Sequence, residues 1–128
     1  MARKKSVPLT EAEQRLMEIV WTLGDCTVGQ IIDAMPAADR PAYNTVQTIM
    51  KILETKGYVR HRADGRAFIY TSIVERAAAA RTALSYVIDR FFGGSPARVA
   101  LNLIGDDRLS AADLEALKRL LDEGKRER

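Results

Sequence analysis

The sequence has one cysteine and one histidine among its 128 residues. A single cysteine excludes an intramolecular disulfide. One cysteine and one histidine together are too few for zinc sites that need several Cys or His ligands. No apolar run approaches the roughly 18 residues that a membrane helix needs, and the basic start lacks the apolar stretch of a signal peptide. We therefore expect a cytoplasmic protein with no metal site and no membrane insertion.

Glycine and proline are also scarce, at 8 and 4 residues, and 47% of the chain is hydrophobic. Collagen-like, low-complexity and disordered chains are excluded on these grounds. No glycine-rich phosphate loop is present, and the carboxylate pair Asp106-Asp107 lies in a polar segment without an apolar pocket. We expect no catalytic residue, no cofactor and no enzymatic activity.

Charge is distributed unevenly along the chain. Residues 6–39 contain one basic residue and six acidic ones, whereas residues 40–72 contain six basic residues and two acidic ones. A basic block within an acidic half indicates an anionic partner, most commonly nucleic acid. Ordinary surface charge is the alternative interpretation.

Two capping boxes predict the first two helices. Thr10 with Glu13 starts a helix that Gly24 ends, and Thr27 with Gln30 starts a shorter helix that ends at Pro36. A third helix is predicted to follow the loop at residues 37–41 and to end near Gly57, and its buried face carries Val46, Ile49, Met50 and Leu53. Its opposite face is made of Asn, Thr, Gln and Lys, which is unusual for a merely solvated helix.

A β-hairpin is predicted next. Residues 58–63 and 66–71 are rich in strand-forming residues and meet at Asp64-Gly65, a strong turn signal. This turn predicts the pairs Ala63 with Arg66, His61 with Phe68 and Val59 with Tyr70. These residues share the face that packs on the helices, while Arg60 and Arg62 lie on the other face.

Three helices followed by a hairpin predict a winged helix-turn-helix, in which the third helix enters the major groove and the hairpin flanks it. Compact polar side chains read base edges, and basic side chains contact phosphates. The candidate DNA-binding residues are Tyr43, Asn44, Thr45, Gln47, Thr48, Lys51, Arg60, Arg62 and Arg66. A winged helix used only for protein–protein contact is the alternative, and the polar, basic composition argues against it.

The chain changes character after Ser72. Residues 74–92, the segment after Ser95-Pro96 and the segment after Ser110 predict three amphipathic helices. In about 50 residues they cannot easily close a core of their own, so they are predicted to pack against a second copy of the chain. Packing back onto the first domain is the alternative. The candidate dimerisation residues are Leu84, Val87, Ile88, Phe91, Leu101, Leu114, Leu117 and Leu121.

Three residues receive structural assignments. We expect His61 to lie partly buried beside Phe68, Trp21 to serve in packing, and Cys26 to be a small buried residue and not a redox switch. Overall, the predicted fold is mainly α with a small β-hairpin. A winged-helix DNA-binding domain occupies residues 1–72 and a helical dimerisation domain residues 73–128.

The chain resembles the BlaI/MecI/CopY family of penicillinase and methicillin-resistance repressors from about Leu9 to Leu121. The stretches that carry the resemblance are Leu9-Thr10-Glu11-Ala12-Glu13, Trp21, Tyr43-Asn44-Thr45-Val46-Gln47-Thr48, Leu53 to Tyr70, Phe91-Phe92-Gly93 and Leu101-Asn102. The resemblance implies a dimeric winged-helix repressor that binds a palindromic operator in double-stranded DNA.

The resemblance also implies a means of release. In one branch of the family, a membrane metalloprotease sensor leads to cleavage of the repressor between an Asn and an aromatic residue of the dimerisation domain. Asn102 matches that Asn, and Leu103 stands where an aromatic residue is usual. The copper-responsive branch needs a C-terminal cysteine cluster, which is absent here. A repressor relieved by another signal is the alternative.

Overall fold

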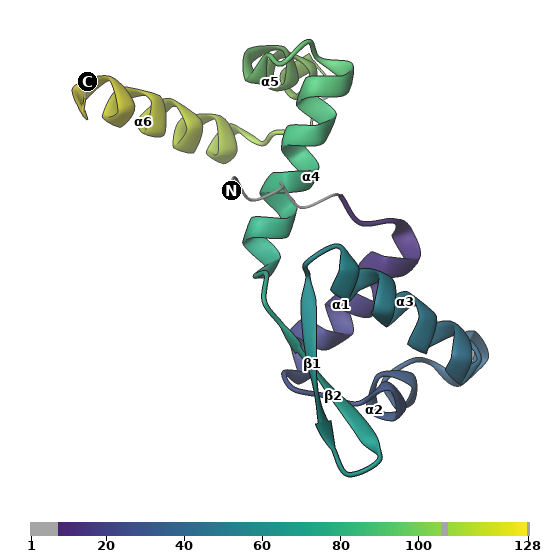
Figure 1. The fold of residues 1–128 in the computed structure, drawn as a ribbon. Coiled ribbons are helices and arrows are strands. Elements are labelled where there is room, and N and C mark those ends of the chain that lie inside the picture. The colour runs from purple at the N-terminus through teal and green to yellow at the C-terminus, as the bar shows by residue number, and fades with distance from the viewer. Residues whose placement is uncertain (1–7, 106–107, 128) are drawn as a thin grey trace. The chain divides into compact units, whose positions relative to one another are not determined.

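The computed structural model describes residues 8–105 and 108–127 (Figure 1). The chain forms two compact units, Met1–Tyr86 and Val87–Arg128, and each is described by itself. The Arg3, Lys4 and Lys5 cluster lies outside the described residues. None of the helices described is long and apolar enough to cross a membrane.

The first unit begins with helix α1 (Glu11–Leu23), and its predicted capping box is confirmed. The backbone N–H of Glu13 donates to Oγ1 of Thr10 at 3.2 Å, and the N–H of Thr10 donates to Oε1 of Glu13 at 2.9 Å. Gly24 ends the helix at φ = 80°, a left-handed conformation that glycine adopts without steric cost. The helix buries Leu16, Met17 and Val20.

Helix α2 (Val28–Asp33) begins at the second predicted capping box, between Thr27 and Gln30. It ends before the predicted stop, and Pro36 instead opens a short 3-10 helix, η1 (Ala37–Asp39). Helix α3 (Tyr43–Thr55) follows and buries Val46, Met50 and Leu53, as predicted, while Ile49 is half-buried.

Strands β1 (Val59–Asp64) and β2 (Ala67–Ser72) form the predicted antiparallel hairpin, but the predicted register is wrong by two residues. His61 pairs with Tyr70, Ala63 with Phe68, and Asp64 with Ala67. The loop is therefore Gly65-Arg66, with Gly65 at φ = 63°. A shift of two residues preserves the alternation of side chains, so the predicted assignment of the two hairpin faces holds.

The core of this unit lies between the three helices and one hairpin face. Its largest fully buried side chains are Tyr58 and Tyr70. Cys26 is 1% exposed, and burial raises the pKa of its thiol to about 11, so the predicted structural role fits and no thiolate forms near neutral pH. Its backbone also pairs with Tyr70, from N of Cys26 to O of Tyr70 at 3.0 Å and in reverse at 2.7 Å. This isolated bridge pairs one residue on the outer edge of β2.

A partly buried ion pair joins the start of α1 to the end of α3. Nζ of Lys56 lies 2.6 Å from Oε1 of Glu13, whose side chain is 7% exposed. Burial raises the pKa of the Glu13 carboxyl, but the hydrogen bonds from Lys56 and Thr10 and the Lys56 charge outweigh it, so the pKa lies below its usual value. Because the folded pKa is depressed, the ionised pair stabilises the fold above the unfolded pKa of about 4.3 and stops doing so as pH falls through the folded pKa.

Replacing Lys56 with Met should lower the free energy of unfolding by about 1.5–3 kcal/mol at pH 7, because Glu13 keeps a buried charge without its cation. Lys51→Met is the control, since Lys51 is exposed on the same helix, and it should change stability by less than about 0.5 kcal/mol. Urea unfolding at pH 7 and pH 3 measures both. If Lys56→Met lowers the free energy of unfolding equally at the two pH values, the effect comes from packing and not from the charge pair.

Three further helices follow the hairpin: α4 (Arg76–Phe91), α5 (Pro96–Gly105) and α6 (Ala111–Glu127). They confirm the three predicted helices, with α4 beginning two residues later and ending one residue earlier than expected. No side chain described in Val87–Arg128 is buried. Large apolar side chains instead remain exposed, among them Phe91 at 70%, Leu101 at 67% and Leu120 at 63%.

Candidate nucleic-acid interface

The exposed face of α3 is mainly polar, and its apolar member is Ile52, which is 41% exposed. Val46, Met50 and Leu53 are buried in the core, so the residues on the opposite side of this helix face outward. The structure places the following predicted residues on the exposed side: Tyr43, Asn44, Thr45, Thr48 and Lys51. Gln47 is half-buried at its margin. The five exposed side chains offer hydrogen-bond donors and acceptors, one aromatic ring and one positive charge to a ligand outside the unit.

The first turn of α3 leaves its polar side chains available. Ala42 is the N-cap residue and makes no side-chain hydrogen bond, so neither Asn44 nor Thr45 serves as the cap. Asn and Thr are common N-cap residues, but neither side chain serves as a cap here. An uncapped helix N-terminus also directs backbone N–H groups outward, which suits phosphate.

Thr48 donates its hydroxyl proton to O of Asn44 at 2.9 Å. Its side chain is exposed, and its oxygen can still accept a hydrogen bond. Thr55, two turns later, makes the same bond to O of Lys51 at 3.1 Å and is also exposed. The two threonines are therefore chemically matched and differ in their position along the helix.

This match defines a prediction for base recognition. Thr48→Ala should weaken binding to the cognate DNA by about 1–3 kcal/mol, the usual cost of one lost base contact. Thr55→Ala removes an equivalent helix hydrogen bond and should leave the affinity within about twofold of the parent, a change near 0.4 kcal/mol. Fluorescence anisotropy with labelled duplexes measures both variants. Equal losses would place the effect in helix stability and not in DNA contact.

The basic block divides into two groups of different function. Arg40 donates from Nε to O of Met35 at 3.0 Å and from Nη2 to O of Asp33 at 3.1 Å, so it satisfies carbonyls at the end of α2. Lys56 binds Glu13. Sequence reasoning gave neither residue a structural role, because each contact depends on how the chain folds back. The four remaining basic residues are the predicted phosphate contacts: Lys51, Arg60, Arg62 and Arg66.

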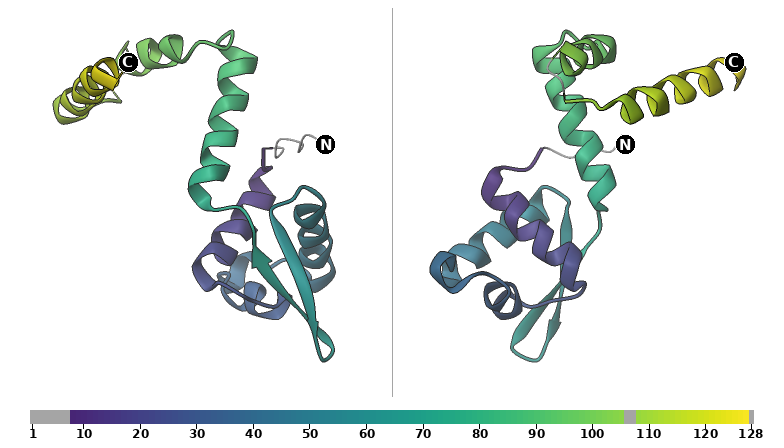
Figure 2. Two further views of the ribbon diagram at one scale, coloured as in Figure 1. Left: turned by 60° about the vertical axis from the view of Figure 1, so that its left-hand side comes forward. Right: turned by 180° about the vertical axis from the view of Figure 1, so that it is seen from behind.

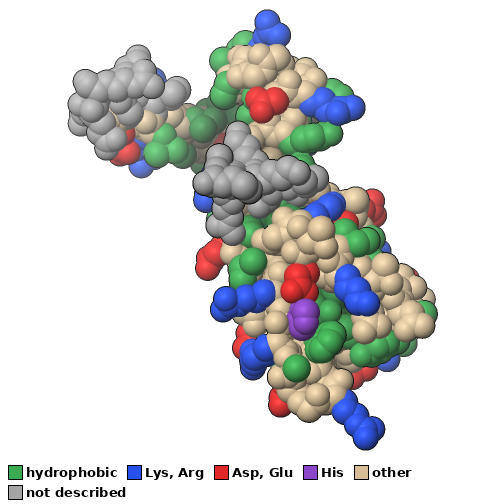
Figure 3. Space-filling model, in the orientation of Figure 1, with side chains coloured by type: hydrophobic (Ala, Val, Ile, Leu, Met, Phe, Trp, Pro, Cys, Tyr) green, Lys and Arg blue, Asp and Glu red, His purple; other side chains and the backbone are tan. Residues whose placement is uncertain are grey.

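The hairpin presents its arginines on the face away from the core and at its loop. Figures 1 and 2 show the hairpin loop projecting beyond the three helices, and Figure 3 shows basic side chains along one side of the hairpin and at its loop end. Arg62 donates from Nη1 to Oδ2 of Asp25 at 3.2 Å, and Thr71 donates to Oδ1 of Asp25 at 2.8 Å. The hydrogen bonds from Thr71 and Arg62 lower the pKa of Asp25. Asp25 therefore stays ionised at neutral pH and orients Arg62, a contact that sequence reasoning did not anticipate.

His61 connects the hairpin to α3. Its ring lies 4.4 Å from the Phe68 ring, which confirms the predicted neighbour, but His61 is exposed and not partly buried as predicted, because Phe68 is itself exposed. Its Nδ1 also lies 2.6 Å from Oε1 of Glu54 on α3, a partner the sequence did not indicate. This contact helps to hold the hairpin against the helix whose polar face is exposed.

Three helices and a hairpin, with a polar helix face and arginines beside it, define a winged helix-turn-helix DNA-binding protein. The profile of the penicillinase repressor family matches residues 9–123. The chain belongs to this family, whose members are transcriptional repressors that bind DNA and are not enzymes.

Individual relatives agree with this assignment. The penicillinase repressor of Bacillus licheniformis is 25% identical over 122 residues, covering 95% of both chains. The methicillin resistance regulatory protein MecI of Staphylococcus aureus strain N315 is 24% identical over 117 residues, covering 91% of this chain and 95% of its own. A solution structure of the DNA-binding domain of the repressor BlaI matches 60% of this chain and 93% of that domain, with a TM-score of 0.51 and 23% identity. That likeness confirms the fold of the first unit.

Proposed function

We propose that this DNA-binding repressor acts in the cytoplasm as a homodimer on a palindromic operator. Residues 1–72 supply the DNA-binding surface and residues 73–128 the dimer contacts. In this assignment, Asn44, Thr45, Gln47 and Thr48 read base edges and Tyr43 packs against the DNA at the start of α3. Lys51, Arg60, Arg62 and Arg66 contact phosphates.

The observation that carries the dimer is the unburied apolar surface of helices α4, α5 and α6. Leu84, Val87, Phe91, Leu101, Leu114 and Leu117 are all exposed, and Ile88 is half-buried. The side chain of Leu121 lies outside the described residues. Soluble monomers rarely leave so many large apolar side chains in water, whereas obligate dimers bury them between subunits. The polar, basic surface of the first unit favours DNA as its ligand over a protein partner.

The two-fold symmetry of a dimer determines how the half-sites of the operator are arranged. The two recognition helices of a dimer reach major grooves on one face of the duplex, so the half-sites should be inverted copies separated by about 10 bp or a multiple of it. Footprinting on genomic fragments selected by the purified protein tests this. A single protected half-site without an inverted partner would contradict the dimeric assignment.

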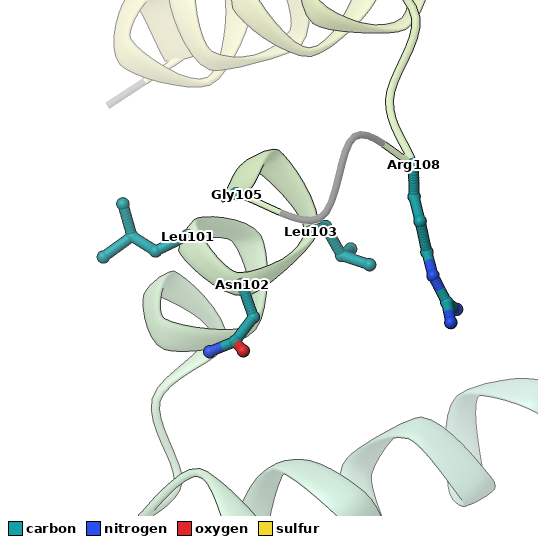
Figure 4. A pocket seen from close by; sticks show the side chains of 5 residues that line it. All are labelled: Leu101, Asn102, Leu103, Gly105 and Arg108. Atoms are coloured by element: carbon teal, nitrogen blue, oxygen red, sulfur yellow. The ribbon is translucent and has the colours of Figure 1, made fainter.

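The proposal includes release by proteolysis. Asn102 and Leu103 lie within α5, and Figure 4 shows the side chains of Leu101, Asn102 and Leu103 pointing to different sides of this helix. Asn102 is exposed and Leu103 half-buried. A membrane metalloprotease sensor is the partner we assign to this step, and a repressor released by another signal is the alternative.

A further inference from the structure

The segment that leaves the hairpin is tied to α1 by a cluster of polar contacts. The indole N–H of Trp21 donates to O of Val74 at 2.8 Å and to Oγ of Ser72 at 3.1 Å. The hydroxyl of Ser72 also donates to O of Val74, at 2.7 Å. We call Glu18, Trp21, Ser72, Val74 and Arg76 the Trp21 latch.

Arg76, the first residue of α4, completes the Trp21 latch. Its guanidinium carbon lies 5.3 Å from the centroid of the Trp21 ring, within cation–π range. Its Nη2 also donates to Oε1 of Glu18, so one side chain on α4 contacts two positions one turn apart on α1. The contacts join residues 51 to 58 positions apart in the chain.

The contacts of the Trp21 latch lie at the margin of the core. Trp21 and Val74 are partly buried and pack against the core, which confirms the predicted packing role of Trp21. Glu18 and Arg76 have side chains that are about half exposed, at 43% and 57%. None of the five residues belongs to α3 or to the hairpin loop, so they do not form the DNA-facing surface described above. These contacts hold the backbone at Val74 and the first turn of α4 against α1.

We propose that the Trp21 latch is a positioning device that sets which half-site spacing the repressor accepts. This inference rests on the proposed dimer, because spacing has meaning only when two DNA-binding units are joined. A latched α4 leaves each DNA-binding unit in one direction, so the DNA-binding unit of the other copy meets its half-site at a defined distance. An unlatched α4 leaves in many directions. The effective concentration of the other copy's DNA-binding unit then falls at the correct half-site spacing and rises at incorrect spacings.

The variant Trp21→Phe with Arg76→Gln opens the Trp21 latch with little risk to the fold. Phenylalanine keeps an aromatic ring at position 21, and O of Val74 still accepts from Ser72 when the indole N–H is gone. Arg81→Gln is the matched control, because Arg81 is an exposed arginine on the same helix and its loss changes the net charge equally.

The test measures affinity by anisotropy for a single half-site, for the natural operator and for operators with one to three added base pairs. The opened variant should bind the half-site within about twofold of the parent, bind the natural operator about tenfold more weakly, and lose less than the parent with each added base pair. Arg81→Gln should match the parent throughout. A spacing profile identical to the parent's, or an equal loss on the half-site, would overturn the role of the Trp21 latch. A parent that binds the operator no more tightly than the half-site would instead overturn the dimer itself.

Discussion

A chain that ends at Tyr86 should be monomeric and should bind a two-half-site operator about 100- to 10,000-fold more weakly than the full protein, because it loses bivalent binding. Its affinity for one half-site should stay within about twofold, since the first unit is a compact body with its own buried core. Ending at Tyr86 and not at Ser72 keeps the Val74 and Arg76 contacts to α1 intact. Light scattering measures the mass of the shortened chain, and fluorescence anisotropy measures its two affinities. A dimeric shortened chain would contradict the assignment of dimerisation to the C-terminal helices.

A point variant tests the same surface in the full chain. Leu117→Gln should weaken dimerisation because it places an amide where an apolar contact is expected. Lys118→Gln is the adjacent control on α6, also exposed, and it should leave the dimer unchanged. Equal behaviour of the two variants would show that Leu117 is not at the interface.

Cleavage between Asn102 and Leu103 should weaken operator binding as strongly as removing the second unit, because the cut separates α6 and its apolar residues from α4. The bond lies inside α5, and the side-chain amide of Asn102 donates to O of Arg98 at 3.2 Å within the same helix. Proteases bind extended chain, so α5 must open locally before the bond is reached, and a general protease should cut it slowly.

Mass spectrometry of the protein from induced cells measures this step directly. Fragments ending at Asn102 are the expected product, and an Asn102→Asp variant should stay intact and keep the target genes repressed. Intact parent chains in cells that fully express those genes would rule out cleavage as the means of release and would favour a different signal.

Local patterns predicted the elements of the first unit well. The capping boxes at Thr10 and Thr27 need only residues three positions apart, and the buried and exposed faces of α3 follow from the helical repeat of Val46, Met50 and Leu53. The polar face of α3 was therefore predictable from the sequence, as was the outward position of Arg60 and Arg62.

Contacts between distant segments were not predictable in this way. The hairpin register depends on how Tyr70 packs in the core and pairs with Cys26, and the Asp64-Gly65 turn signal contains neither interaction. The same holds for Lys56 with Glu13, 43 positions apart, and Arg62 with Asp25, 37 positions apart. Charge in the sequence showed where basic residues are, and only the fold showed which of them already have an acidic partner.

The ratio of operator affinity to random-duplex affinity, measured for the parent and for Asn44→Ala, tests the central claim most directly. Asn44 lies exposed in the first turn of α3, where it does not cap the helix, so the claim that this face reads base edges depends on its side chain. Asn44→Ala should lower the ratio by about 5- to 150-fold, equivalent to 1–3 kcal/mol, with little change in random-duplex affinity. An unchanged ratio would contradict the assignment of α3 as the recognition helix.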